Sequence, residues 1–563
     1  MQRHRVMISA AVVAAAIGFV PTAAQAADQP AQRQGSAAAA MDSAKAAAAK
    51  AAVFHSPAER TIRTSTSAST STSGKAAAPQ AAGAADATDA AKGNAGLAVG
   101  LRASATSAHG FSLASQITTT AGVPVKVDID WGDGRTDTEH VTGSKLLTSK
   151  HTFTELGKHQ VKVTLTDQDN RVTATNSVEV QSLGSKFTPH APTRLLDTRS
   201  GVGGSNRPVG PYGVARVKVG GNSGIPADAT AVALNLTVVS PRSGGHITAY
   251  PSGTVQPTTS NVNFVAGQTV PNMTIVPVGA DGYVELANRS YGDVDLVADV
   301  TGYFSRSATA GGYTSLDPFR IADSRTGQGT WGQVAGQSTF ALQVAGNGAI
   351  PASGVTAVAL NVTATAPRGA GHLTVFPTGQ EAPNTSNVNF KAGQTIANSV
   401  IVPVGPDGRI NVRNGAWDPA DVIVDVVGYY SPGSKASYIP TTPTRLHDSR
   451  EYEFPVQGQD FRWLPLSDDD PAITAFVLNT TVTDPQGSGH LTVAPDPYTY
   501  AQRENGAPKP TPPNSSNLNW TKGETVPNLV QASTGTTGVI DFWNRGWDPT
   551  HLVVDMFGFY DKS

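Results

Sequence analysis

The chain has 563 residues, which is more than one hydrophobic core normally serves, so several domains are expected. Its 41 lysines and arginines nearly balance 43 acidic residues, and the net charge of -2 excludes the basic field that would hold nucleic acid. No cysteine occurs, which excludes disulfides and thiol catalysis and leaves stability to packing alone.

The first 26 residues have the pattern of a secretory signal peptide. Arg3 and Arg5 form a basic start, residues 6–20 form an apolar stretch, and residues 24–26 are Ala-Gln-Ala, a small-residue cleavage site. We therefore expect export and an extracellular location, either free or associated with the cell surface. No later stretch is apolar and long enough to span a bilayer, so no membrane insertion is expected.

Residues 27–94 are rich in Ala, Ser and Thr and contain scarcely any large apolar side chain. Such a segment cannot bury enough surface to offset the entropy that is lost on ordering, so it is predicted to be a disordered linker. Within it, residues 37–52 have high helix propensity and predict at most a transient helix.

Residues 95–183 show short alternating segments separated by Gly, Asp and Asn turns, which is the pattern of a small β-sandwich. Three motifs follow one another here: Trp-Gly-Asp-Gly at 131–134, His-Thr-Phe-Thr-Glu-Leu-Gly at 151–157 and Val-Lys-Val-Thr-Leu-Thr-Asp at 161–167. Together they resemble the polycystic-kidney-disease (PKD) domain, and the resemblance implies an Ig-like fold. Leu156 stands where that family usually has proline.

The acidic residues of this module superficially resemble a calcium loop, because Asp128, Asp130 and Asp133 precede Gly134. The spacing departs from the EF-hand pattern, and the residues match the PKD turn instead. We therefore expect no cofactor, with a structural Ca2+ as the alternative.

Three copies of a second domain follow, in residues 184–306, 307–432 and 433–563. Each copy contains Arg-aliphatic-x-Asp-Ser/Thr-Arg, a Gly-His pair after a turn, Ser-Asn-x-Asn-aromatic, Gly-Gln/Glu-Thr and a closing Gly-aromatic-aromatic sequence. The motifs are anchored by Arg194, Arg320 and Arg445, by His246, His372 and His490, by Ser260, Ser386 and Ser516, and by Gly302, Gly428 and Gly558. The period is that of whole domains rather than of a solenoid.

Each copy predicts about eight short strands separated by turns. Residues 231–239, for example, place Val232, Leu234, Leu236 and Val238 on one face. The predicted fold class is therefore all-β: an Ig-like β-sandwich followed by three tandem β-sandwich or jelly-roll-like domains. The copies resemble a repeat common in secreted actinobacterial proteins, where it accompanies PKD-like, peptidase or glycan-active modules, and this resemblance implies a location more than an activity.

The repeated polar residues have two interpretations. An enzyme would need a concave pocket that joins His246, Asp299 and Asn261 in one copy. However, Asp299 and Asp425 have apolar neighbours on both sides, which predicts buried carboxylates that each pair with an Arg of the first strand. No nucleophile elbow, zinc-protease, P-loop or dinucleotide motif occurs. We therefore predict no enzymatic activity, and an enzyme of unfamiliar type is the least favoured alternative.

Aromatic residues occur in the late loops of the copies: Tyr291, Trp417 and Trp547. Such a residue on a sandwich rim either stacks on a sugar ring or anchors its own loop. The turn histidines either hold the turn or face a ligand. Together these residues form the candidate ligand-binding set: Trp417, Trp547, Tyr291, His246, His372 and His490.

The favoured function is that of a secreted, non-catalytic protein of binding or adhesion, whose tandem domains give avidity for cell-wall or extracellular polysaccharide. The alternative is a structural spacer or scaffold that binds other secreted or cell-surface proteins. Neither function involves nucleic acid.

Overall fold

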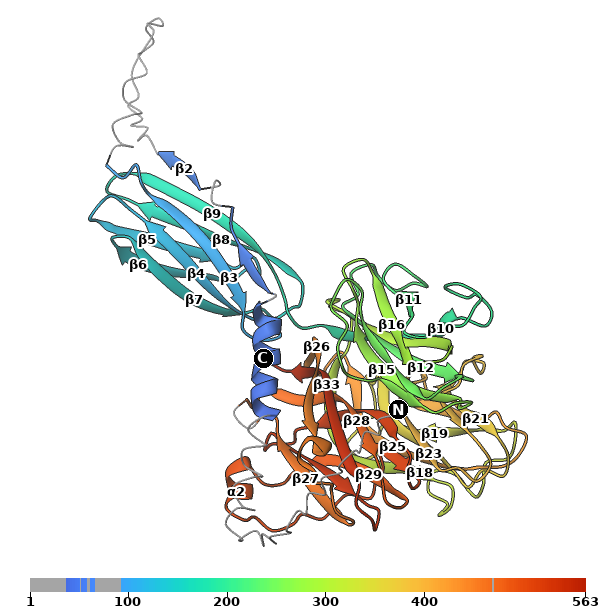
Figure 1. Cartoon of the computed structure of the whole chain (residues 1–563). Helices are drawn as coiled ribbons and strands as arrows, with labels where there is room; N and C mark the ends of the chain where they lie inside the picture. The colour runs from blue at the N-terminus through green and yellow to red at the C-terminus, as the bar shows by residue number, and fades with distance from the viewer. Residues whose placement is uncertain (1–36, 51, 58–60, 66–92, 468–469) are drawn as a thin grey trace, which may run out of the picture.

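The computed structural model describes residues 37–50, 52–57, 61–65, 93–467 and 470–563, and the expected signal peptide lies outside them. Almost all of the regular secondary structure in the described residues is antiparallel β-strand, which confirms the predicted all-β class. An Ig-like module stands beside a larger body that contains the three copies, here called repeats 1, 2 and 3 (Figure 1). None of the described helices is both long and apolar enough to cross a membrane.

The Ig-like module is a sandwich of two sheets with strand orders β1-β3-β4-β7 and β2-β9-β8-β5-β6. Its strands are β1 (Val53–His55), β2 (Ile62–Ser65), β3 (Ala98–Ala105), β4 (Gly110–Thr118), β5 (Pro124–Asp130), β6 (Thr136–Thr142), β7 (Lys145–Thr152), β8 (Lys158–Asp167) and β9 (Val172–Gln181). Strand β9 alternates between buried and part-exposed residues, because one face packs on the core and the other meets water. Trp131, Phe111 and Phe153 fill that core.

The structure departs from the disordered-linker prediction at three segments. Strand β1 pairs with β3, and β2 pairs with β9, so both extend the sheets of the Ig-like module. Residues 37–50 form a helix whose Ala37, Met41 and Ala44 lie in the core of repeat 3. Composition measures only what a segment can bury against itself, whereas this small apolar stripe is buried on a surface that another domain provides.

Each repeat is a jelly-roll sandwich of eight strands, in which an inner sheet has the order 1-8-3-6 and an outer sheet the order 2-7-4-5. Repeat 1 contains β10 (Lys186–Asp197), β11 (Val214–Lys218), β12 (Ala231–Val239), β13 (Gly245–Pro251), β14 (Val262–Phe264), β15 (Val270–Pro277), β16 (Tyr283–Ser290) and β17 (Asp295–Ser305). Repeat 2 contains β18 (Gly312–Asp323), β19 (Thr339–Gln343), β20 (Ala357–Thr365), β21 (Gly371–Pro377), β22 (Val388–Phe390), β23 (Ile396–Pro403), β24 (Arg409–Asn414) and β25 (Asp421–Ser431).

Repeat 3 repeats this plan with β26 (Ser437–Asp448), β27 (Asp460–Pro465), β28 (Ile473–Thr483), β29 (Gly489–Pro495), β30 (Leu518–Trp520), β31 (Val526–Ser533), β32 (Val539–Asn544) and β33 (His551–Asp561). It adds a 3-10 turn, η2 (Ser449–Tyr452), and a short helix, α2 (Tyr500–Glu504). Helix α2 belongs to an insertion between β29 and β30. Arg503 of this helix donates two hydrogen bonds to Asp496 at the end of β29, and these bonds hold the insertion against the sandwich.

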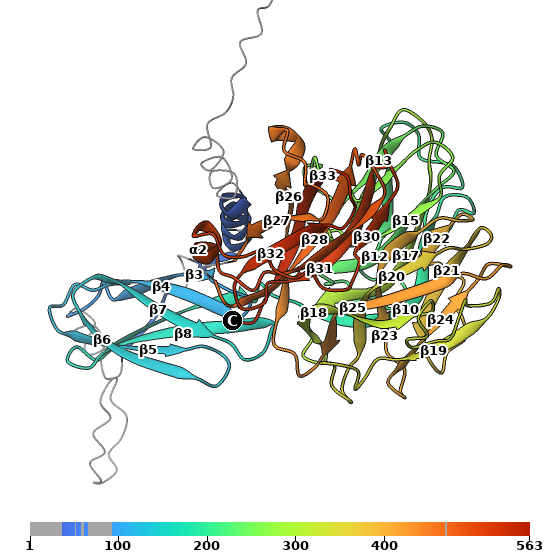
Figure 2. The same ribbon diagram turned by 90° about the horizontal axis from the view of Figure 1, so that it is seen from below.

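The three repeats pack together around a common centre, and they do not hang as separate beads (Figure 2). Strand β12 shows why, because eight of its nine residues are buried. Val232 and Leu234 face the core of repeat 1, whereas Ala231 and Ala233 join a second core to which all three repeats contribute. Phe304, Tyr430 and Tyr560, the closing aromatics of the repeats, also lie in this shared core.

Buried asparagines close the arrangement into a ring. Asn398 of repeat 2 donates to Asn235 Oδ1 of repeat 1 (2.9 Å) and accepts from the backbone N–H of Met273 (3.0 Å). Asn528 of repeat 3 makes the same two bonds to repeat 2. Asn272 of repeat 1 makes them to repeat 3. The body is therefore a covalently linked, pseudo-threefold trimer of jelly rolls.

The Ig-like module is attached at the end of repeat 3. The backbone N–H of Ala108 donates to Asp561 Oδ2 (3.0 Å), and that of His109 donates to the Ser563 carbonyl (3.0 Å). The His109 ring also lies 3.2 Å from Ser437 Oγ, and burial lowers the pKa of this histidine. Ala108 of the module lies in the core of repeat 3, and Leu183 packs against both cores, so a small apolar contact joins the module to repeat 3.

Candidate binding surface

The repeated Arg and Asp residues form internal ion pairs, as the apolar flanks predicted. Arg194 donates from Nε to Asp299 Oδ1 (2.9 Å) and from Nη1 to Asp197 Oδ2 (3.1 Å). The equivalent groups in the other repeats are Arg320 with Asp425 and Asp323, and Arg445 with Asp555 and Asp448. Burial raises the pKa of Asp299, and the guanidinium opposes that rise. The cluster stabilises the first and last strands of each repeat, which are hydrogen-bonded neighbours.

The structure does not bring His246, Asp299 and Asn261 into one pocket. Asn261 is used inside its own repeat, where it accepts from the Ala249 N–H (2.7 Å) and donates to Thr274 Oγ1 (2.7 Å). Asp299 is held by Arg194, as described above. His246 lines a cavity in which neither of the other two takes part. The geometric condition for the enzyme hypothesis is therefore not met.

The three candidate histidines are half-buried at the starts of equivalent strands, each opposite an asparagine across the sheet edge: His246 and Asn263, His372 and Asn389, His490 and Asn519. Burial lowers their pKa values, and nearby arginines lower them further. For His490 the pKa falls to about 4, with Arg545 and two arginines of repeat 2 contributing. All three rings are consequently neutral near pH 7 and suited to hydrogen bonding rather than to charge pairing.

The candidate aromatic residues are almost fully in contact with solvent. The exposed fraction is 84% for Tyr291, 86% for Trp417 and 83% for Trp547. A loop anchor would be tucked against the sandwich, so that interpretation is wrong for these side chains. In repeat 1 the Tyr212 ring lies edge-on to Tyr291 at 5.4 Å between ring centroids and widens the aromatic surface.

The loops that carry these aromatics are held firmly from beneath. Asn414, the last residue of β24, donates to the carbonyls of Val334 (3.0 Å) and Asp418 (2.9 Å) and accepts from the Ala416 N–H (2.9 Å). Asn544 makes the equivalent three bonds below Trp547. Asn288 donates to three carbonyls around the loop of Tyr291. We did not select these asparagines from the sequence, although an Asn three residues before each exposed aromatic is a signal that all three repeats share.

The three aromatic loops lie at the same end of the body. In repeat 1 the Gly267 N–H donates to the Pro241 carbonyl (2.8 Å), and the next residue, Arg242, donates from its N–H to Asp293 of the aromatic loop (2.9 Å). The corresponding donors are Gly393 and Arg368 in repeat 2, and Gly523 and Gln486 in repeat 3. The turns that contain these glycines converge on one cavity, so the loops tied to them share one face of the trimer. We call it the loop face.

Another exposed tryptophan, Trp331, was not singled out from the sequence. It is 87% exposed but lies in a turn of repeat 2 before β19, where neither of the other repeats has an aromatic at the corresponding position. Its loop is bonded to the loop of Trp417 through Val334 and Ala420, so Trp331 belongs to the same end of repeat 2.

The carboxylates of the Ig-like module have separate protein partners. Asp128 accepts from Thr138 Oγ1 (2.7 Å) and pairs with Lys126, Asp130 accepts from the Gly132 N–H (2.9 Å), and Asp133 lies 2.8 Å from His151 Nε2. Within the described ranges, no three acidic, His or Cys side chains are grouped so that they could hold a metal ion. Hydrogen bonds to these partners lower the pKa of Asp128 and Asp133 against an opposing effect of burial.

Comparisons with known proteins find matches among solved structures alone. No family model and no curated protein matches the sequence. Among solved structures, a SusE-like protein aligns over 36% of this chain and 96% of its own at 11% identity and a TM-score of 0.12. Carbohydrate-binding modules of the β-sandwich superfamily align over 34% of this chain and 89% of their own, at 14% identity and a TM-score of 0.13. A triple jelly-roll protein of an archaeal virus turret aligns over 68% of this chain and 92% of its own, at 8% identity and a TM-score of 0.15. With TM-scores this low, these likenesses do not bear on what the chain binds.

Proposed function

We propose that this chain is a secreted, non-catalytic protein that binds polysaccharide through the loop face of its jelly-roll trimer. The observation that carries the proposal is the exposure of Tyr291, Trp417 and Trp547 on loops that buried asparagines hold in place. The signal-peptide pattern of the first 26 residues supports secretion.

An exposed aromatic ring costs free energy in water unless a partner covers it. The C–H face of a sugar ring is such a partner, because it is apolar while its hydroxyl groups stay hydrated at the edge. Since the loops are already ordered by Asn288, Asn414 and Asn544, little conformational entropy is lost when a ligand stacks on them.

Three such contacts on one rigid body act together. The shared core and the asparagine ring fix the loops relative to one another, so a polymer held by one aromatic is presented to the other two at high effective concentration. A repetitive polysaccharide offers the same sugar face many times and benefits from this arrangement, whereas a monosaccharide does not.

The test is co-sedimentation of the full mature chain with insoluble cell wall, chitin and cellulose, using Trp417→Ala, Trp547→Ala and Tyr291→Ala singly and combined. Each single substitution is expected to weaken retention about two- to tenfold, and the triple variant to lose it. Leu146→Ala, at an exposed apolar side chain of β7 in the Ig-like module, is the control and should bind as the parent does.

Equal retention of the parent and the triple variant would contradict the proposal. Retention that soluble sugar cannot compete away, together with capture of a defined secreted protein, would instead support the scaffold alternative.

A further inference from the structure

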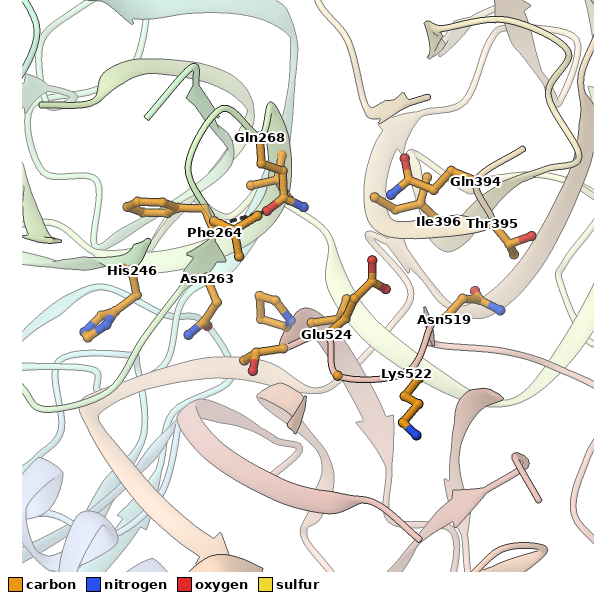
Figure 3. Close-up of a pocket in the computed structure, with 17 residues that line it drawn as sticks. His246, Asn263, Phe264, Gln268, Gln394, Thr395, Ile396, Asn519, Lys522 and Glu524 are labelled. Atoms are coloured by element: carbon orange, nitrogen blue, oxygen red, sulfur yellow. Dashed lines mark hydrogen bonds between the residues drawn. The ribbon is translucent and has the colours of Figure 1, made fainter. Parts of the chain in front are cut away.

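A cavity of about 450 Å3, here called the axial cavity, lies on the loop face where the three repeats meet (Figure 3). The Gly-Gln/Glu-Thr turn of each repeat forms part of its wall, through Gln268, Gln394 and Glu524. Its volume falls in the range of small-molecule sites. It exists once per chain, because all three repeats are needed to build it.

The three turn side chains are held by their own turns. Gln268 Oε1 accepts from the Val265 N–H (3.0 Å), Gln394 Oε1 from Lys391 (3.0 Å) and Glu524 Oε2 from Thr521 (2.8 Å). Each bond uses one oxygen. Within the described part of the chain, the Nε2 groups of Gln268 and Gln394 and the second oxygen of Glu524 make no hydrogen bond. The cavity is therefore lined by pre-positioned donors from repeats 1 and 2 and by an acceptor from repeat 3.

Repeat 3 breaks the threefold symmetry at this ring. Glu524 replaces a glutamine, and Lys522 stands on the rim where repeats 1 and 2 have Ala266 and Ala392. Asn519 differs too, because its Oδ1 is buried without a partner in the described structure, whereas Asn263 accepts from Ser260 Oγ (3.0 Å).

The chemistry of the lining favours a polyhydroxylated ligand. A simple anion is disfavoured by the Glu524 carboxylate, and a simple cation by Lys522 and the amide N–H groups. A sugar hydroxyl both donates and accepts, so it fits the mixed set, while Val270 and Ile396 give an apolar wall for the ring. We propose that the axial cavity binds one sugar residue of the polysaccharide, as a central subsite between the three peripheral aromatics.

This inference rests on the proposed function for the class of ligand, but it uses different residues. The probes are soluble chitotriose and cellotriose, titrated calorimetrically into the full mature chain. We expect one of them to bind with a stoichiometry of one per chain. Because the aromatic loops occur three times, this stoichiometry separates the axial site from them.

Two substitutions use the variation among the repeats themselves and so preserve each turn. Gln394→Glu keeps the bond to Lys391, as Glu524 does in its own turn, but removes a donor from the cavity. Glu524→Gln keeps its turn in the same way and removes the negative acceptor. Each variant is expected to weaken oligosaccharide binding at least about fivefold, and Glu451→Gln, a surface change in repeat 3, should leave it unchanged.

The triple aromatic variant should retain oligosaccharide binding at the axial site while losing retention on insoluble polysaccharide. Failure of both probes to bind, or binding that is unaffected by Gln394→Glu and Glu524→Gln, would overturn the axial site and leave the proposal for the aromatic loops standing.

Discussion

The Ig-like module and the repeats are both β-sandwiches, but they bury their sheets differently. Strand β9 of the module alternates between buried and part-exposed residues, whereas strand β12 of repeat 1 is buried along almost its whole length. A sheet with one wet face is complete in itself. A sheet whose second face is covered by neighbouring repeats is not, so the three repeats form a single cooperative unit and the module a separate one.

Truncation after residue 432, which removes repeat 3, should have the largest effect on the stability of the repeats. Ala231, Ala233 and Phe304 would lose part of the shared core, and we expect repeats 1 and 2 to aggregate or lose cooperative unfolding. The Ig-like module should keep its own thermal transition, which calorimetry and limited proteolysis can follow. A stable, monomeric pair of repeats would contradict the single-unit interpretation.

Asparagine-to-alanine substitutions in the two regions should differ in cost. Asn398→Ala leaves the Met273 N–H, Asn235 Oδ1 and the Asn387 carbonyl without their partner, so the free energy of unfolding should fall by about 2–5 kcal/mol. Asn176→Ala in the Ig-like module removes bonds to Val99 and Ser56 and should cost about 1–2 kcal/mol. Chemical denaturation measures both, and equal costs would argue against a special role for the asparagine ring.

The two regions should also respond oppositely to pH. Burial, reinforced by the neighbouring Asp496, raises the pKa of Asp541 in repeat 3 to about 9. Between about pH 4 and 9 the folded repeats therefore hold a proton that the unfolded chain releases, and their stability falls as the pH rises through this window. In the Ig-like module, partners lower the pKa of Asp167, so stability is instead lost as the pH falls below about 4.

Asp541→Asn isolates the effect in repeat 3. The amide has no charge to bury, so at pH 8 the repeats should gain at least about 1 kcal/mol, and their alkaline loss of stability should shrink. Calorimetry from pH 5 to pH 9 follows both transitions in one sample. An unchanged slope for the repeats would show that Asp541 is not the group responsible.

The smallest effect is expected for the loop aromatics. Trp417→Ala should change the free energy of unfolding by less than about 0.5 kcal/mol, because the side chain is 86% exposed. Trp131→Ala, which empties the core of the Ig-like module, should cost about 3–5 kcal/mol. A large loss of stability for Trp417→Ala would mean that this ring supports its loop after all.

Much of the fold could be predicted because its signals are local. Alternating apolar residues indicate strands, and the repeated motifs mark three equivalent domains wherever they occur in the chain. The buried pair of Arg194 and Asp299 was also predictable, since an acidic residue between apolar neighbours in a strand requires a partner. Residue type and position in the sequence indicated the aromatic loops, but neither showed that the rings are exposed to solvent.

The amino-acid sequence by itself determined the all-β class, the number of repeats and the charge pairs within them, because each depends on residues in one short pattern or one copy. Only the tertiary structure decided that the repeats close into a trimer, that helix 37–50 is buried on repeat 3 and that the aromatic loops share one face with an axial cavity. The physical reason is that these features depend on contacts between domains, such as the bond from Asn398 to Asn235, 163 residues apart, which no local pattern specifies.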